Sequence, residues 1–208
     1  MSSALSKTAI DTHFHVFRAG TAQAGARYAP AYDAAFSDWQ AKAALLGVGR
    51  GVLVQTSFMG SDNTQLMTEL TRWPDVLRGV AVVEPDATLQ TLQPLHRAGV
   101  RGIRLNLAGM SHDLSHWSRA TPFWNALHSL GWHLELHTDI GRLPQVLAHI
   151  PDEMALVIDH MAKPETISAH DPTVRALTER ARRGNVHLKL SGAYRLGGSM
   201  PANWPACG

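Results

Sequence analysis

The sequence predicts an α/β fold built on a parallel sheet, and two observations carry this prediction. Seven short runs rich in β-branched and apolar residues recur along the 208 residues, and segments with a helical pattern separate them. A chain that alternates strand and helix forms βαβ units, whose strands lie parallel. The spacing of the runs suits either a (β/α)₈ barrel or an open doubly wound sheet.

The expected strands read as nearly continuous apolar runs, as strands covered on both faces do. They cover residues 8–17, 50–57, 77–85, 99–107, 132–139, 155–160 and 186–192. The first of them is not followed by G-x-G-x-x-G, which disfavours a sheet that binds a dinucleotide.

Helical patterns fill the intervals between these strands. They cover residues 36–48, 62–73, 87–99, 121–131, 142–150 and 171–183. Ser37 is the expected N-cap of the first helix, Asp62 or Asn63 that of the second, and Thr121 that of the fourth. Pro94 is expected in the first turn of a short helix, because proline inside a longer helix removes a backbone hydrogen bond.

Length and composition predict one domain over residues 1–208, with an irregular tail over 197–208. The net charge of +2 and the lack of a basic run argue against a nucleic-acid partner. No apolar run reaches the length of a membrane span, and the N-terminus lacks the apolar core of a signal peptide. Cys207 is the one cysteine, which excludes an internal disulfide framework. We therefore expect a cytoplasmic protein without a membrane partner.

Polar side chains gather at the C-terminal ends of the expected strands, where parallel α/β folds form their active sites. His13 and His15 are two residues apart, so they point to the same side of the first strand. The later strand ends carry Gln55, Ser57, Arg104, Asn106, Glu135, His137, His160, Lys189 and Ser191, and Arg195 follows in the next loop. Each alone is more often structural, but strand ends converge in a closed barrel, so the joint pattern predicts a functional site.

Two chemistries suit these residue types. The H-x-H pair offers neutral imidazoles to a divalent metal ion, as one strand of a metal site would. The same imidazoles can instead donate hydrogen bonds to developing negative charge without any metal. The guanidinium groups of Arg104 and Arg195 match the two oxygens of a carboxylate. Together they predict hydrolytic or lyase chemistry on a small anionic substrate.

The sequence resembles the amidohydrolase superfamily, a metal-dependent hydrolase branch of the TIM barrels. The matching segments are "DTHFHVF" in the first strand, "ELHTD" in the fifth and "VIDHMAKP" in the sixth. The segments "VLVQTSFMGSDNTQLM" and "LKLSGAYR" bring it nearest to the lactonase group that includes 2-pyrone-4,6-dicarboxylate lactonases. The resemblance runs from about residue 10 to residue 196 and implies a TIM-type (β/α)₈ barrel with hydrolase activity.

The resemblance also implies roles for single residues. His13, His15 and His160 would surround the lactone carbonyl and its attacking water. The substrate-binding residues would be Ser57, Arg104, His137 and Arg195, with the two arginines on the substrate carboxylates. A bound metal ion would take its ligands from His13, His15, His137 and His160. Because pyrone lactonases are understood to work without a metal, no cofactor is expected, and one zinc or manganese ion is the alternative.

The resemblance departs from the family at the C-terminal end. The superfamily carries an aspartate after an eighth strand, whereas this sequence ends in "RLGGSMPANWPACG". We therefore expect an incomplete barrel of about seven strands, C-terminally truncated. Its unpaired edge strands would favour self-association. Loss of a positioned acid–base group would slow hydrolysis by about 10²–10⁴-fold.

Three functions remain open on the sequence. The first is hydrolysis of a carboxylated lactone during the catabolism of aromatic compounds. The second is decarboxylation of an aromatic or unsaturated acid with zinc held by the same histidines. The third is a non-catalytic relative that only binds small anions.

Overall fold

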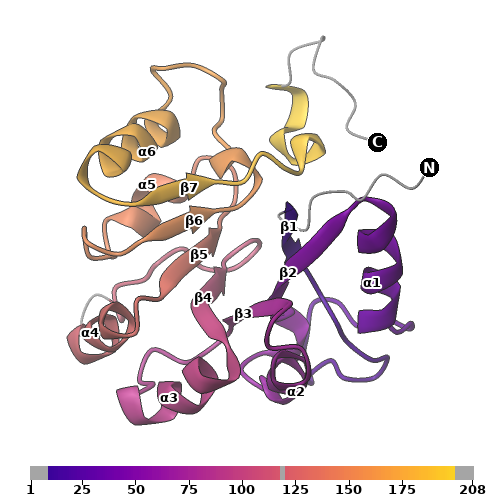
Figure 1. Cartoon of the computed structure of the whole chain (residues 1–208). Helices are drawn as coiled ribbons and strands as arrows, with labels where there is room; N and C mark the ends of the chain where they lie inside the picture. The colour runs from indigo at the N-terminus through magenta and orange to yellow at the C-terminus, as the bar shows by residue number, and fades with distance from the viewer. Residues whose placement is uncertain (1–8, 118–119, 200–208) are drawn as a thin grey trace. The chain divides into compact units, whose positions relative to one another are not determined.

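The computed structural model of the chain describes residues 9–117 and 120–199 (Figure 1). Within these ranges seven strands follow one another in sequence order in one sheet. The strands are β1 (Ala9–Phe14), β2 (Val48–Val54), β3 (Leu77–Ala81), β4 (Val100–Asn106), β5 (His133–His137), β6 (Leu156–Ile158) and β7 (Val186–Leu188). The helices are α1 (Phe36–Leu45), α2 (Thr64–Arg72), α3 (Leu89–Ala98), α4 (Thr121–Ser129), α5 (Leu143–Leu147) and α6 (Pro172–Arg183). The predicted alternation of strand and helix is confirmed.

Three short 3₁₀ helices follow strand ends, namely η1 (Ser57–Met59), η2 (His160–Ala162) and η3 (Ala193–Ser199). The last of them extends into the segment expected to be an irregular tail, and residues 200–208, with Cys207, lie outside the described residues. Among the helices of the described residues, none combines the length and the apolar character needed to cross a bilayer.

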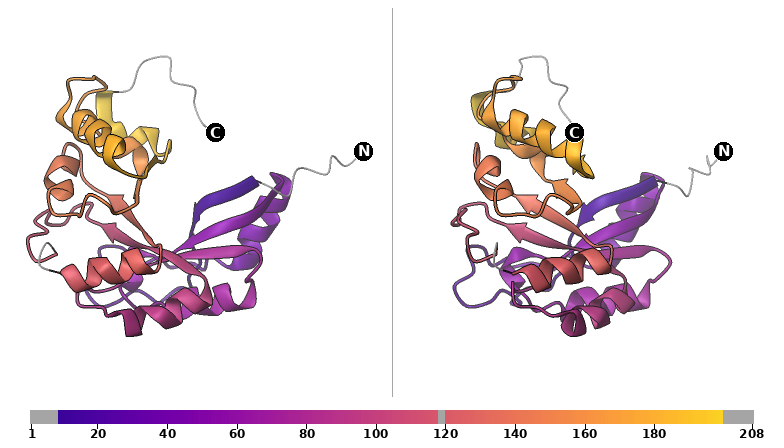
Figure 2. Two further views of the ribbon diagram at one scale, coloured as in Figure 1. Left: turned by 60° about the vertical axis from the view of Figure 1, so that its left-hand side comes forward. Right: turned by 90° about the vertical axis from the view of Figure 1, so that its left-hand side faces the viewer.

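The chain divides into two compact units, which we describe one at a time. Unit 1 comprises Met1–Arg104 and Ser129–Trp132 and contains β1, β2, β3 and the first part of β4. Its strands pair in parallel, with Leu53 opposite Gly79 and Val80 opposite Gly102. Helices α1, α2 and α3 cover one face of these strands (Figure 2). The core between them holds Leu53, Leu70, Leu77, Val80, Leu92 and Ile103.

Unit 2 comprises Leu105–His128 and His133–Gly208 and contains β5, β6 and β7. These strands are also parallel, with Leu136 opposite Ile158 and Ile158 opposite Leu188. The core of this unit holds Leu134, Leu136, Leu143, Val146, Leu156 and Ile158, none more than 1% exposed. The strands β3, β4, β5 and β6 therefore follow the pattern of buried parallel strands that the apolar runs predicted, whereas β1 and β7 are largely exposed.

Two predicted positions are wrong, namely the N-cap of α1 and the place of Pro94 in α3. Helix α1 begins earlier than expected, with Ala35 rather than Ser37 as its N-cap, because the Asp38 carboxylate accepts the Ala35 N–H at 3.1 Å. Pro94 lies inside α3 instead of in its first turn. Its missing N–H leaves the carbonyl of Gln90 without a helical partner, but both residues are exposed, so water can reach that carbonyl.

The second helix confirms one of its two expected caps. Asn63 occupies the N-cap position of α2, while the carboxylate of its neighbour Asp62 accepts the N–H of Thr64 at 3.1 Å. Hydrogen bonds from the Thr64 side chain and from its backbone N–H hold the pKa of the Asp62 carboxyl below its usual value.

Candidate active site

The first candidate group lies at the C-terminal end of β1 in unit 1. His13 is on the strand and His15 follows it by two residues, and their Nε2 atoms are 3.2 Å apart. The Nδ1 atom of His15 lies 2.7 Å from the carbonyl oxygen of Val54, which can only accept a hydrogen bond. A neutral His15 therefore carries its proton on Nδ1 and presents the lone pair of Nε2 to His13. The predicted pairing of these two imidazoles is confirmed.

Contacts between β1 and helix α1 fix the strand that leads to His13 and His15. The Asp11 carboxylate accepts the backbone N–H of His13 at 3.0 Å and the indole N–H of Trp39, on α1, at 2.8 Å. Phe14 stacks on the same indole with the ring centroids 4.3 Å apart. Gly51 makes this packing fit, because a Cβ there would lie 2.6 Å from the Trp39 ring. Phe14 is thus buried against α1, whereas His13 and His15 are half-buried and contact each other.

Two further predicted residues belong to unit 1. Ser57 begins η1 after β2 and is exposed, whereas Gln55, two residues earlier, is buried. Gln55 donates its side-chain amide to the carbonyl oxygens of Gly60 and Asp62, which fixes the loop that carries Ser57. Arg104 lies on β4 and is 6% exposed.

The second candidate group lies in unit 2, where His137 ends β5 and His160 begins η2 after β6. Their rings meet edge to face, with centroids 4.7 Å apart. Lys163, three residues after His160, places Nζ 3.3 Å from Nε2 of His137. Both Lys163 and His137 are buried, at 6% and 5% exposed. The structure therefore brings His137 and His160 together as predicted and adds Lys163 to them.

A strained turn holds this second group. His160, Met161, Ala162 and Lys163 all have positive φ, between 44° and 62°, although none of them is glycine. Such a conformation costs of order 1–3 kcal/mol per residue and persists only where the surroundings hold it. Here Met161 N–H donates to Lys189 O at 2.9 Å, and Gly141 N–H donates to Lys163 O at 3.0 Å. Strain of this kind clusters at active sites and ligand clamps.

The segment after β7 seats the ring of His160. The hydroxyl of Ser191 lies 3.2 Å from its Nδ1 atom. Gly192 has φ +64°, and a Cβ at this position would lie 2.5 Å from the same atom. Glycine is therefore required here both by the backbone conformation and by the approach of the imidazole.

A buried ion-pair network lies beside these histidines. Lys189 Nζ is 2.5 Å from Glu135 Oε2 and 3.0 Å from Asp159 Oδ1, and the side chains of both acids are only 1% exposed. Lys163 lies 4.0 Å from Asp139 Oδ1. Burial lowers the pKa of Lys163, while the carboxylate of Asp139 acts in the opposite direction.

The last predicted residue, Arg195, lies in η3 of unit 2. It is exposed, and its guanidinium lies 5.3 Å from the ring centroid of Tyr194. Its charge also lowers the pKa of Lys163, so the two cations are close enough to act on each other. The charge of Arg195 therefore acts on Lys163, which itself lies beside His137.

One set of donors in unit 2 has the spacing of a metal site. The ligand atoms of His137, Asp159 and His160 all lie within 4.8 Å of one another. Two of these three residues, however, already have an ammonium group at hydrogen-bond distance, His137 from Lys163 and Asp159 from Lys189. A divalent ion would have to share its ligands with two positive charges, so this donor set does not fit a metal ion as it stands.

Sequence reasoning gave no role to Lys163 or Asp159. Both lie in "VIDHMAKP", a segment whose pattern predicts a role for its histidine alone. The dipeptide Lys163–Pro164 was the available signal, because a residue before proline avoids helical conformations and marks a turn. The sequence places Glu135 and Lys189 at strand ends but does not predict that they form an ion pair. Their contact depends on the arrangement of strands that are distant in the sequence.

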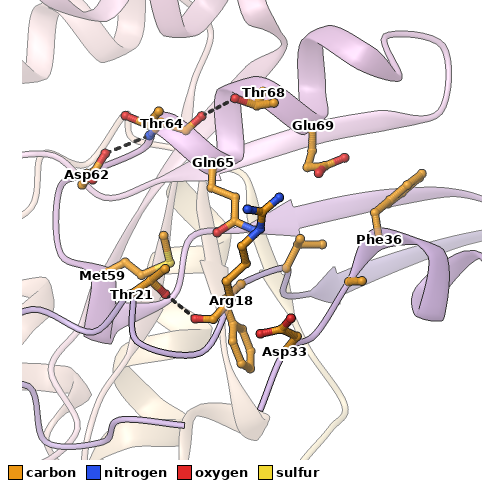
Figure 3. A pocket seen from close by; sticks show the side chains of 13 residues that line it. Arg18, Thr21, Asp33, Phe36, Met59, Asp62, Thr64, Gln65, Thr68 and Glu69 are labelled. Carbon is orange, nitrogen blue, oxygen red and sulfur yellow. Dashed lines mark hydrogen bonds between the residues drawn. The ribbon is translucent and has the colours of Figure 1, made fainter. Parts of the chain in front are cut away.

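A cavity of about 730 Å³ lies elsewhere in unit 1, between the segment after β1 and helix α2 (Figure 3). Arg18 extends across it toward Gln65, and the carboxylates of Asp33 and Glu69 lie on either side. Its lining includes Val16, Phe36 and Met59 but none of the predicted site residues. The cavity therefore has no part in the chemistry predicted from the strand ends.

Comparison with known proteins agrees with this arrangement of strands and histidines. The family model described as amidohydrolase matches residues 10–207. The chain belongs to the amidohydrolase family. Among solved structures, a 2-pyrone-4,6-dicarboxylic acid hydrolase of Pseudomonas putida is 38% identical to this amidohydrolase, with a TM-score of 0.79, and the match covers 94% of this chain and 72% of the other. The predicted incomplete barrel of the TIM type, with about seven strands, is confirmed: the described residues form seven strands, and the matches cover 72% of these two solved structures.

Two curated relatives are enzymes of similar chemistry. The 2-pyrone-4,6-dicarboxylate hydrolase of Comamonas testosteroni is 31% identical over 93% of this chain. The 4-sulfomuconolactone hydrolase of Rhizobium radiobacter is 30% identical over 94% of it. The amidohydrolase described here spans 65% and 67% of the lengths of these relatives.

Two further solved structures carry bound molecules. A 2-pyrone-4,6-dicarboxylic acid hydrolase of Acinetobacter baumannii with citric acid bound is 32% identical, with a TM-score of 0.77, and the match covers 90% of this chain and 72% of the other. An amidohydrolase of Burkholderia multivorans with bound zinc is 24% identical, with a TM-score of 0.67 and coverage of 88% and 69%. The Burkholderia structure shares the fold of this chain, and at 24% identity it gives no information about the ligands that this chain binds.

Proposed function

We propose that this amidohydrolase hydrolyses the ring ester of a small carboxylated lactone, of which 2-pyrone-4,6-dicarboxylate is the model substrate. The observation that carries the proposal is the fixed pair of imidazoles at the end of β1, with their Nε2 atoms 3.2 Å apart. The two curated relatives support it, because both are named as hydrolases of cyclic esters that bear acidic groups.

Hydrolysis of a lactone ring ester has three parts. Water adds to the ring carbonyl, the negative charge on the carbonyl oxygen must be stabilised, and the ring C–O bond then breaks to release a carboxylic acid. We assign the surroundings of the carbonyl and its attacking water to His13, His15 and His160. An imidazole N–H held in a fixed orientation lowers the energy of an oxyanion. His15, whose N–H is directed at Val54 O, would act through the lone pair on Nε2. An imidazole with a lone pair in the same set can accept the proton of the attacking water.

Substrate carboxylates require cationic or hydrogen-bonding partners. We assign this binding to Arg104 and Arg195, whose guanidinium forks match a carboxylate, and to Ser57 and His137 as hydrogen-bonding groups. Burial of Arg104 supports the assignment, since a charge removed from water interacts more strongly with a bound anion. The citric acid bound to the Acinetobacter relative is an anion of the same class.

Hydrolysis without a bound metal ion is part of the proposal. A metal ion would polarise the carbonyl and activate water, and its ligands would come from His13, His15, His137 and His160. The ammonium groups beside His137 and Asp159 argue against that alternative. Slow turnover by these 208 residues, self-association and a cytoplasmic location stay predictions from the sequence.

Mass spectrometry of the product tests the proposal against decarboxylation. The purified protein is incubated with 2-pyrone-4,6-dicarboxylate, with and without added zinc. A product heavier by one water supports lactone hydrolysis. Loss of carbon dioxide, dependent on zinc, would establish the decarboxylase instead.

Binding measurements test the assigned carboxylate partners and identify a protein that only binds anions. Arg104→Met and Arg195→Met should each weaken calorimetric binding of the dianion about tenfold or more, as loss of a charge-assisted hydrogen bond does. Arg97→Met, at an exposed position of α3, is the matched control and should bind like the parent protein. Tight binding with no product over the buffer rate would support the non-catalytic reading.

A further inference from the structure

The position of Lys163 fixes the protonation of His137. An ammonium group has only donors, so at 3.3 Å it must donate to a lone pair on Nε2 of His137. A neutral imidazole with its lone pair on Nε2 carries its proton on Nδ1. The lone pair that a neutral His137 could offer to a metal ion is therefore already directed at a cation.

The neighbouring acid is occupied in the same way. Lys189 Nζ lies 3.0 Å from Asp159 Oδ1 and also contacts Glu135, so this ammonium bridges two buried carboxylates. Lys163 in turn lies 4.0 Å from Asp139. Each buried positive charge thus has acidic partners, and an added divalent ion would repel both ammonium groups at short range.

The strained turn explains why the lysine is held there. Four consecutive residues with positive φ reverse the chain after β6, and this reversal returns Lys163 to His137 after only three residues. The Lys163 backbone N–H donates to the backbone carbonyl of His160 at 3.2 Å, so the turn closes on the residue that carries the second imidazole of the pair. One backbone conformation therefore sets the places of both the lysine and His160.

We propose that Lys163 is a resident cation that takes the place of a divalent metal ion at His137 and holds this imidazole as its Nδ1–H tautomer. Lys163 acts through His137 and is a positioning residue. The proposal concerns metal affinity and tautomer alone, so it stands or falls independently of the substrate assigned above.

Calorimetric titration with zinc chloride alone tests the metal part. The parent protein should bind zinc weakly, Lys163→Met should bind it at least tenfold more tightly, and Lys163→Arg, which keeps the charge, should behave like the parent. This gain in zinc affinity should disappear in the double variant that carries Lys163→Met and His137→Gln. Stoichiometric tight zinc binding by the parent protein through His137, or unchanged affinity in folded Lys163→Met, would overturn the proposal.

Nitrogen-15 NMR of the histidine side chains tests the tautomer part in the unaltered protein, where folding is not in question. The resonances of His137 are assigned by their loss in His137→Gln. The expected result is a protonated Nδ1 and an unprotonated Nε2. A protonated Nε2 in the parent protein would contradict the contact with Lys163 and remove the basis of the proposal.

Discussion

The imidazole pair of unit 1 and the imidazole pair of unit 2 reach similar geometry by different means. His13 and His15 are two residues apart on one segment at the end of β1, where the pairing with β2 is irregular, and a backbone carbonyl fixes the tautomer of His15. His137 and His160 come from different elements, and a strained turn, a buried lysine and a close glycine hold them. The difference teaches that the first pair can be recognised from the spacing of neighbouring residues, whereas the second joins residues from separate elements. Tertiary contacts hold both pairs.

The largest expected effect comes from removing one imidazole of either pair. His13→Ala and His160→Ala should each lower the turnover of 2-pyrone-4,6-dicarboxylate by about 10²–10⁴-fold, since both lose a positioned group at the reacting carbonyl. His128→Ala, at an exposed position of α4, is the control and should keep the parent rate. Full activity in either variant would show that its pair takes no part in the reaction.

Gly192 tests the tertiary support of the second pair. Gly192→Ala places a methyl group 2.5 Å from the His160 ring and should lower turnover about 10²-fold, as misplacement of a catalytic group by about an ångström does. Gly131→Ala is a matched control, because Gly131 has the same φ of +64° but no atom within 4 Å of the added Cβ.

Both glycine variants should lose about 1–2 kcal/mol of unfolding free energy, the cost of the left-handed conformation for a residue with a side chain. Only Gly192→Ala should lose activity beyond the loss of folded protein. An equal fall in activity for the two variants would refute the assigned role of Gly192.

Smaller effects, on unfolding free energy, are expected from the helix caps of the two units. Asp171 caps α6 by accepting the N–H groups of Thr173 and Val174 at 2.8 Å and 3.4 Å, whereas Thr88 caps α3 by accepting that of Thr91 at 3.3 Å. Asp171→Ala and Thr88→Ala should each cost about 0.5–2 kcal/mol in chemical denaturation.

The two caps should differ in their response to pH. Burial alone would raise the pKa of Asp171, but the N–H groups of Thr166, Thr173 and Val174 and the Thr166 hydroxyl together outweigh it and hold that pKa below its usual value. The stabilisation is therefore complete above the unfolded pKa of about 3.9 and is lost as pH falls through the lower folded value. Asp171→Asn should remove this contribution to acid sensitivity, and a Thr88 variant should leave it unchanged. Unaltered acid unfolding in Asp171→Asn would contradict the assigned cap.

Much of the fold and one half of the candidate site could be predicted from the sequence. Apolar runs and the spacing of His13 and His15 report local periodicity, which the strands preserve. The position of Pro94 inside α3 could not be predicted. A proline inside a helix is tolerated where the carbonyl it leaves unpaired, here that of Gln90, is exposed to water, and the sequence does not report this exposure. Lys163 was missed because four successive non-glycine residues in left-handed conformation contradict local preference and arise only from the surrounding contacts.

The most direct test of lactone hydrolysis is the loss of pyrone absorbance with the purified 208-residue protein, measured side by side for 2-pyrone-4,6-dicarboxylate and for 2-pyrone without carboxylates. We predict acceleration over buffer for the dicarboxylate, a much smaller effect on 2-pyrone, and loss of the acceleration in His13→Ala. Rates equal to buffer for both compounds in folded protein, or equal acceleration of both, would contradict a carboxylate-directed lactone hydrolase.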